Sequence, residues 1–185
     1  AAEAAALAAG KPHSLLHVDR AEIDLPPGTD PYSAAVYSRA KENLVRLQAT
    51  GVLVRETGPC LYVYQQQIGA HVQRGLVAGC RVDDYDAGLI KKHEKTRKDK
   101  EDDRTRLIDT LSADTGPILL TYRDTASVTA LVDAKTREQP WHDFIAPDGI
   151  RHEAMAEELD PVAARRLLMT HPVYGRHKTA VGDRV

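Results

Sequence analysis

The fold class follows from WHDFIAPDGIRHEAMA, residues 141–156. Two runs suited to strands, Trp141–Ala146 and Ile150–Ala156, flank the tripeptide Pro147-Asp148-Gly149. Asp-Gly favours tight turns, and short strands on both sides of such a turn pair as an antiparallel hairpin. The stretch therefore predicts two neighbouring antiparallel strands late in the chain.

Further short apolar runs lie between turn signals and predict more strands. Leu61–Tyr64 follows the Gly58-Pro59 break, with Val52–Val54 before it, which indicates a strand, a turn and a strand. The other predicted strands are Ser14–Asp19, Arg74–Val82, a buried Ile118–Tyr122 and Pro172–Tyr174. We expect an α+β fold with a mixed, largely antiparallel sheet and flanking helices.

Two segments have strong helical patterns. In Tyr32–Thr50, apolar residues recur at helical spacing and form one stripe, and Gly51 follows as a C-terminal cap. Lys98–Ala113 is charged on one side and apolar on the other. Shorter helices are expected at Ala2–Ala9, Ser127–Lys135 and Asp160–Met169. Because the chain stops soon after a motif that should open a helix, we expect residues 1–185 to be a single α+β domain from a longer protein.

Composition excludes several classes of protein. Of the 185 residues, 42% are hydrophobic and 28% are charged, which is the balance of a folded globular chain. The formal net charge of −2 argues against a nucleic-acid partner. Apolar runs such as Ile118–Leu120 are too short to cross a membrane, and Ala1–Ala9 lacks the basic start of a signal peptide. We expect a cytoplasmic protein without a membrane partner.

The first chemical cluster is His93-Glu94 with Thr96, Lys100, Asp103 and Arg104. A Glu beside a His can act as a general base or orient one, Thr96 offers a hydroxyl, and Lys and Arg complement phosphoryl oxygens. A zinc-protease His-Glu-x-x-His signature is excluded because position 97 is Arg97. The alternative is a solvated helix start with charge pairs one turn apart.

Two further clusters give weaker signals. Gly175, Arg176, His177 and Lys178 follow a short strand and can bring backbone N–H groups and cations to a phosphate, although they do not form a P-loop. The alternative is a basic turn. In Asp148–His152, Asp-Gly is first of all a turn, and neighbouring side chains on a strand face opposite sides.

Several of these segments together resemble a widespread family of uncharacterised conserved proteins. Its full-length members contain a His-Glu-x-Thr motif, a later Asp-Gly-x-x-His segment and an Asp-Gly-His-His-Arg box. The segments that carry the resemblance are Ser14–Val18, Gly51–Leu53, Leu61–Tyr64, Arg74–Leu76, Asp84–Tyr85, His93–Thr96 and Asp103–Arg104.

That box relates the family, at a distance, to the ParB and sulfiredoxin-like superfamily, and Gly175–Lys178 would match its Gly-His-His-Arg part. Some members of that superfamily bind nucleotides, and some phosphorylate free serine. Here Gly175 directly follows Tyr174, so the Ile-Ala-Asp expected before the glycine is missing, and Arg176 and Lys178 replace the usual His and Arg. The missing Asp would be a catalytic or metal-binding residue.

The resemblance implies a nucleotide-dependent kinase or related phosphotransferase acting on a small molecule such as free serine. ATP or ADP with Mg²⁺ would be the cofactor, by analogy with the superfamily. His93, Glu94, Thr96 and Asp103 would serve catalysis. Phosphate binding would fall to Lys100, Arg104, Gly175, Arg176, His177 and Lys178. The alternative is a nucleotide-binding regulatory or scaffold module without turnover.

Overall fold

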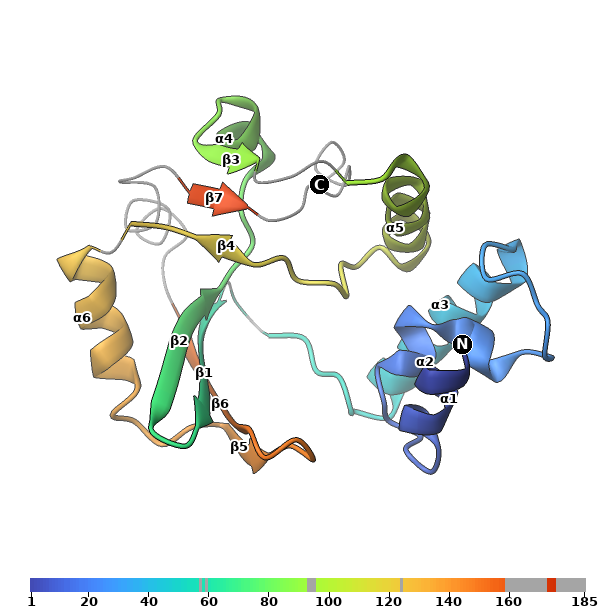
Figure 1. Cartoon of the computed structure of the whole chain (residues 1–185), viewed down its shortest axis with the longest axis horizontal. Helices are drawn as coiled ribbons and strands as arrows, with labels where there is room; N and C mark the ends of the chain where they lie inside the picture. Colours follow the sequence, from blue (N-terminus) through green and yellow to red (C-terminus); the bar gives the residue numbers. More distant parts are fainter. Residues whose placement is uncertain (57, 59, 93–95, 124, 159–172, 176–185) are drawn as a thin grey trace. The chain divides into compact units, whose positions relative to one another are not determined.

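The computed structural model describes residues 1–56, 58, 60–92, 96–123, 125–158 and 173–175 (Figure 1). The chain divides into two compact units. The first comprises Ala1–Arg55, Lys92–Leu119 and the segment from Gly175, and the second comprises Glu56–Lys91 and Leu120–Tyr174.

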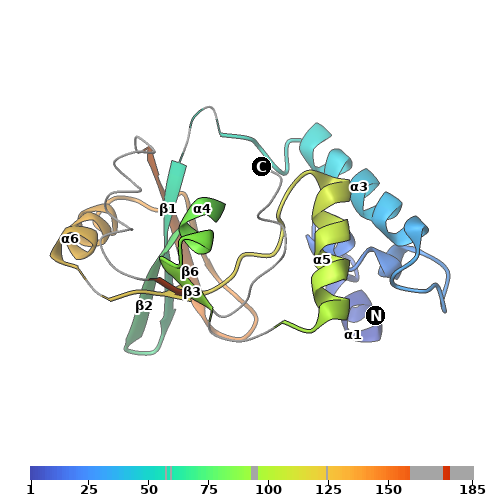
Figure 2. The ribbon, with the colours of Figure 1, turned by 90° about the horizontal axis from the view of Figure 1, so that it is seen from above.

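The first unit is helical in its described part. Its elements are α1 (Ala2–Ala8), α2 (Leu16–Asp19), the 3₁₀ helix η1 (Ala21–Asp24), α3 (Ala34–Ala49) and α5 (Lys98–Leu111). The helices α3 and α5 lie side by side (Figure 2). The structure confirms the predicted helices at both positions. Helix α3 begins two residues after and ends one residue before its predicted bounds, and α5 begins at the predicted Lys98 and ends two residues early.

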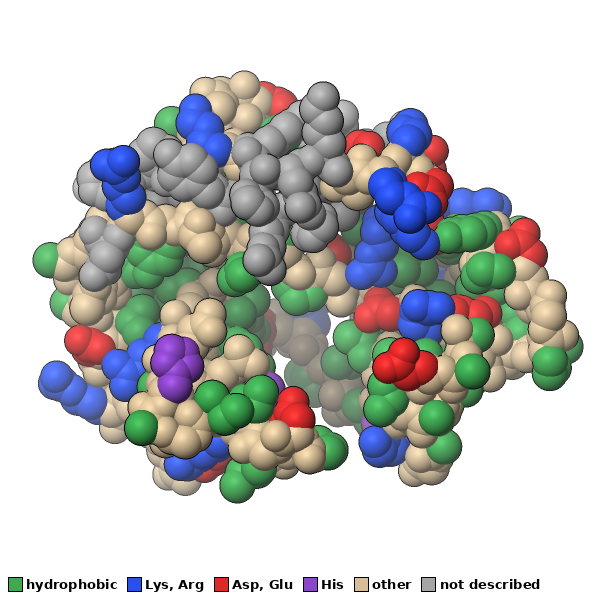
Figure 3. Space-filling view, viewed as in Figure 1, with side chains coloured by type: hydrophobic (Ala, Val, Ile, Leu, Met, Phe, Trp, Pro, Cys, Tyr) green, Lys and Arg blue, Asp and Glu red, His purple; other side chains and the backbone are tan. Residues whose placement is uncertain are grey.

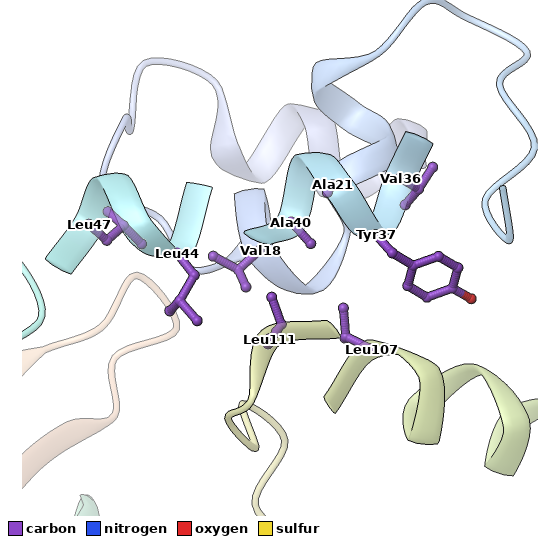
Figure 4. Close-up of a cluster of buried hydrophobic side chains, with 9 residues drawn as sticks. All are labelled: Val18, Ala21, Val36, Tyr37, Ala40, Leu44, Leu47, Leu107 and Leu111. Carbon is purple, nitrogen blue, oxygen red and sulfur yellow. The ribbon is translucent and has the colours of Figure 1, made fainter. Parts of the chain in front are cut away.

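The core of this unit is the buried stripe of α3 packed on α2 and α5. Val36, Ala40, Leu44 and Leu47 are the stripe that the sequence predicts, and all four are buried. Val18 of α2 and Leu107 and Leu111 of α5 complete the cluster, with Ala21 and Tyr37 (Figure 4). Burying each large aliphatic side chain stabilises the unit by about 2 kcal/mol.

Two predicted strands of this unit are wrong. Ser14–Asp19 contains α2, because the Ser14 hydroxyl accepts a 3.3 Å hydrogen bond from the backbone N–H of Leu16 and Val18 is buried among helices. Val52–Val54 is not a strand either. The N–H groups of Val52 and Leu53 both donate to the carbonyl of Leu47, at 3.0 and 3.1 Å, and so close the end of α3.

The second unit contains a four-stranded antiparallel sheet in the order β2-β1-β6-β5. The strands are β1 (Cys60–Ile68), β2 (His71–Val77), β5 (His142–Ile145) and β6 (Arg151–Glu158). The hairpin predicted around Pro147-Asp148-Gly149 is confirmed, with the Ala146 N–H donating to the Ile150 carbonyl at 2.8 Å. Gly149 has φ +83°, a conformation that favours glycine.

Helix α6 (Ala126–Lys135) confirms the helix predicted at Ser127–Lys135 and packs on this sheet. The side chains of Val128 and Val132 on α6 are buried against Val63 of β1 and Met155 of β6. The α+β class is therefore confirmed, with an antiparallel sheet and flanking helices.

A second sheet has three short strands in the order β3-β7-β4. These are β3 (Ile90–Lys92), β7 (Val173–Gly175) and β4 (Leu120–Thr121), and β7 confirms the short strand predicted near Tyr174. Two predictions are corrected in this unit. The strand predicted at Arg74–Val82 ends at Val77, because Val82 begins α4 (Val82–Asp86), and the run Ile118–Tyr122 forms only β4 and is not buried. The helix predicted at Asp160–Met169 lies outside the described residues.

Candidate functional site

The structure describes half of the predicted site residues. His93, Glu94, Arg176, His177 and Lys178 lie outside the described residues. Gly175 ends β7, and Thr96 precedes α5. The remaining three, Lys100, Asp103 and Arg104, lie on α5. That His93 and Glu94 lie in one site with Gly175–Lys178 stays a prediction.

Lys100, Asp103 and Arg104 line one groove of about 400 Å³ in the first unit, here called the α5 groove. Residues three and four positions apart lie on the same face of a helix, so this spacing aims all three side chains to one side of α5. The opposite wall comes from α2, η1 and the start of α3. Its polar members are Asp19, Arg20, Glu22, Tyr32 and Tyr37.

Asp103 is held by the buried Tyr37, whose hydroxyl donates a 2.7 Å hydrogen bond to Asp103 Oδ1. Burial raises the pKa of the Tyr37 hydroxyl far above its ordinary value of 10.0, and the hydrogen bond to Asp103 raises it further. Tyr37 therefore remains a donor at any ordinary pH, and one carboxylate oxygen of Asp103 is fixed in place.

Arg104 lies beside Asp19, with 3.8 Å between Arg104 Nη1 and Asp19 Oδ1. That distance is too long for a hydrogen bond, so the two charges attract each other without saturating the guanidinium. Asp19 also accepts a hydrogen bond from the Thr115 hydroxyl. The side chain of Arg104 is 33% exposed, which leaves it accessible from the groove.

Lys100 reaches the same groove through Tyr32. Its ammonium donates a 2.9 Å hydrogen bond to the Tyr32 hydroxyl and lies 5.4 Å from the centroid of the Tyr32 ring. The hydrogen bond to Tyr32 raises the pKa of Lys100, so the ammonium is charged at neutral pH. Arg20 is paired with Glu22, with 2.8 Å between Nε and Oε1.

The groove therefore brings together three cations and three carboxylates. Figure 3 shows acidic and basic side chains intermixed over α5. Such a surface suits a ligand that carries both an anionic group and an ammonium. Among the described residues, no three His, Cys, Asp or Glu side chains cluster to hold a metal ion by themselves.

Asp19, Arg20, Tyr32 and Tyr37 were missed by sequence reasoning. Asp19 ends the run that was predicted as a strand, which hid its place on α2, and Arg20 directly follows it. Tyr37 directly follows Val36 and so lies at the edge of the apolar stripe of α3. This position is the one feature of the sequence that indicates that Tyr37 faces a neighbouring helix.

Comparison with known proteins gives one result. The family model described as "Protein of unknown function (DUF1015)" matches residues 1–162. No curated protein and no solved structure matches the chain. Within the part of the chain that the structure describes, no helix is both long enough and apolar enough to span a membrane.

Proposed function

Since this chain belongs to the DUF1015 family, whose description names no activity, we propose its function from the geometry of the α5 groove. The protein is a nucleotide-dependent phosphotransferase that acts on a small molecule, such as a free amino acid, and the groove binds the phosphate. One observation carries the proposal: Lys100 and Arg104 line the same groove as a positioned carboxylate, Asp103.

Phosphate binding suits the two cations. The Cβ atoms of residues one helical turn apart are about 6 Å from each other, so an anion can lie between Lys100 and Arg104. Arg can hold two phosphate oxygens in a planar fork, and Lys adds a compact charge that carries three donors. Arg104 is partly shielded from solvent, which strengthens its interaction with an anion, whereas Lys100 is exposed.

The carboxylates of the groove fit the rest of the chemistry. Mg²⁺ is commonly held by one or two carboxylates together with phosphate oxygens, so Asp19 and Asp103, which share the groove, would hold it and neutralise developing charge. Either carboxylate can also attract the ammonium of an amino acid. In the predicted site, His93 and Glu94 precede α5 and would supply the base.

A second function, nucleotide binding without turnover, is favoured by a specific observation. The groove cations already have protein partners: Arg104 faces Asp19, Arg20 pairs with Glu22, and Lys100 bonds to Tyr32. Asp103 is likewise engaged by Tyr37. Groups that the protein itself holds in this way can position a bound nucleotide without taking part in proton or phosphoryl transfer.

Calorimetry on the full-length protein tests the proposal. ATP and ADP, each with and without Mg²⁺, are titrated into the wild type, the Lys100→Ala/Arg104→Ala double variant and Lys98→Ala. Lys98 lies on the same helix, is 77% exposed, and is paired with Asp102. We expect the double variant to lose at least about tenfold in affinity, and Lys98→Ala to bind as the wild type does.

A product assay separates the two functions. Wild-type protein is incubated with labelled ATP, Mg²⁺ and a panel of free amino acids that includes serine. Phosphoryl transfer to an acceptor supports the phosphotransferase. Nucleotide binding without transfer supports the second function, a nucleotide-binding module without turnover. Absence of nucleotide binding overturns both.

A further inference from the structure

The segment that follows α5 folds back onto the α5 groove. Helix α5 ends at Leu111, and Ser112 takes the left-handed conformation with φ 53°. Asp114 Oδ1 then accepts a 2.9 Å hydrogen bond from the N–H of Gly116, which fixes a tight turn. Residues 112–116 therefore form an ordered loop at the groove, here called the return loop.

The return loop contacts one acid of the groove. The hydroxyl of Thr115 donates to Asp19 Oδ1, the same oxygen that lies 3.8 Å from Arg104 Nη1. Asp19 and Thr115 are 96 positions apart in sequence. The loop thereby ties the end of α5 to α2 and holds one wall of the groove.

Gly116 lies against the guanidinium of Arg104. A Cβ placed on Gly116 would overlap Arg104 Nη2 and lie 3.0 Å from Arg104 Cζ, so the guanidinium would have to move. The φ angle of Gly116 is outside the range that requires glycine, and Pro117 after it favours an extended backbone that any residue adopts. A side chain at position 116 would therefore leave the backbone unstrained and would instead move the flexible end of the Arg104 side chain.

We propose that Gly116 is a positioning residue for Arg104, because the missing side chain lets the guanidinium lie against the return loop beside Asp19. This inference rests on the proposed phosphate-binding function of the groove. The return loop thus contributes to ligand affinity, because it fixes the position of the Arg104 guanidinium that binds the phosphate. A methyl group at position 116 displaces the fork and misaligns its two donors.

A double-mutant cycle tests this role with inorganic pyrophosphate and ATP as the probes. The four proteins are the wild type, Gly116→Ala, Arg104→Ala and the combined variant. We expect Gly116→Ala to weaken binding about tenfold in the wild-type background, the size of one charge-assisted hydrogen bond. In the Arg104→Ala background we expect no further loss, because the group that Gly116 positions is gone.

Gly79→Ala is the matched control. Gly79 lies outside the first unit, has no atom within 4 Å of an added Cβ, and has no φ in the left-handed range. The ¹⁵N NMR signal of the Arg104 Nε–H group supplies a readout that general destabilisation does not move. It should shift in Gly116→Ala and remain unchanged in Gly79→Ala.

The outcomes are distinguishable. If the wild type binds neither probe, the proposed function is overturned, and the Arg104 signal still tests the positioning. If the wild type binds and Gly116→Ala binds equally well, the positioning role is overturned. The role is equally overturned if Gly116→Ala weakens binding as much in the Arg104→Ala background. Should Gly116→Ala fail to fold, Thr115→Val removes the other anchor of the return loop and is expected to weaken binding several-fold.

Discussion

Tyr37 on α3 donates a 2.7 Å hydrogen bond to Asp103 on α5, across 66 positions of sequence. Arg106 lies over the Tyr37 ring, with 4.5 Å from its guanidinium carbon to the ring centroid. The contact joins the buried stripe of α3 to the charged face of α5. One tyrosine thus belongs both to the hydrophobic core and to the candidate site.

Tyr37→Phe should reduce the free energy of unfolding by about 1 kcal/mol at neutral pH, because Asp103 loses its donor while the ring remains. The folded-state pKa of Tyr37 is raised above its unfolded value near 10.0, so its contribution is fully present below about pH 10. It is lost as the pH rises further towards the folded-state value. Urea denaturation from about pH 8 to about pH 11 should therefore show the two proteins converging in stability. A difference that stays constant over this range contradicts the assignment.

Asn43 is a second buried polar residue on α3, and its side-chain amide bonds two partners. It donates to the His17 carbonyl at 2.7 Å and to Asp24 Oδ2 at 2.8 Å, and the residue is 7% exposed. Asn43→Leu should lower the free energy of unfolding by about 2 kcal/mol or more, since both acceptors lose this donor. Gln48→Ala, on the exposed side of the same helix, should change it by less than about 0.5 kcal/mol. Equal effects of the two substitutions in thermal denaturation count against a structural role for Asn43.

Gly149→Ala tests the hairpin between β5 and β6. Its φ of +83° is one that alanine rarely adopts, although the space around it is open. We expect a loss of about 1 kcal/mol in the free energy of unfolding from strain alone. Gly79→Ala, with equally open space and no left-handed φ, should be neutral or slightly stabilising. Chemical denaturation of the two variants measures the difference between their free energies of unfolding. Equal stabilities would show that the turn adopts another conformation in solution.

The elements that the sequence predicted well are the long or periodic ones. Val36, Ala40, Leu44 and Leu47 repeat over several turns, and no strand can bury all four on one face. Ser14–Asp19 is too short for its period to be resolved, so a run of apolar residues was taken for a strand when it is α2. Strand β1 extends to Ile68 through three glutamines that carry no hydrophobic alternation, so only its first half was predicted.

The candidate site was predictable only where its residues are close in sequence. Lys100, Asp103 and Arg104 share one helix face, and their spacing is visible in the sequence alone. Asp19 and Tyr37 join them through contacts that span tens of residues, which no local pattern encodes. Gly116 carries no signal beyond that of a helix breaker, because its role depends on where the Arg104 side chain lies.

Asp103→Asn separates catalysis from binding in the α5 groove. The substitution keeps the size of the side chain and an oxygen that can accept from Tyr37, but it removes the negative charge. If Asp103 takes part in proton transfer or holds Mg²⁺ in the proposed phosphotransferase reaction, kcat should fall about 100-fold or more. The affinity for metal-free nucleotide should be unchanged or slightly higher, because one repulsive charge beside the phosphate is gone.

Asp102→Asn is the control, since Asp102 is 62% exposed and is paired with Lys98 on the same helix. Steady-state turnover and calorimetry on both variants make the comparison. A loss of turnover confined to Asp103→Asn places this carboxylate in the reaction. Weaker nucleotide binding in Asp103→Asn, with turnover of the bound nucleotide unaffected, would instead show that the bond from Tyr37 to Asp103 shapes the groove and that the chemistry is performed by other residues.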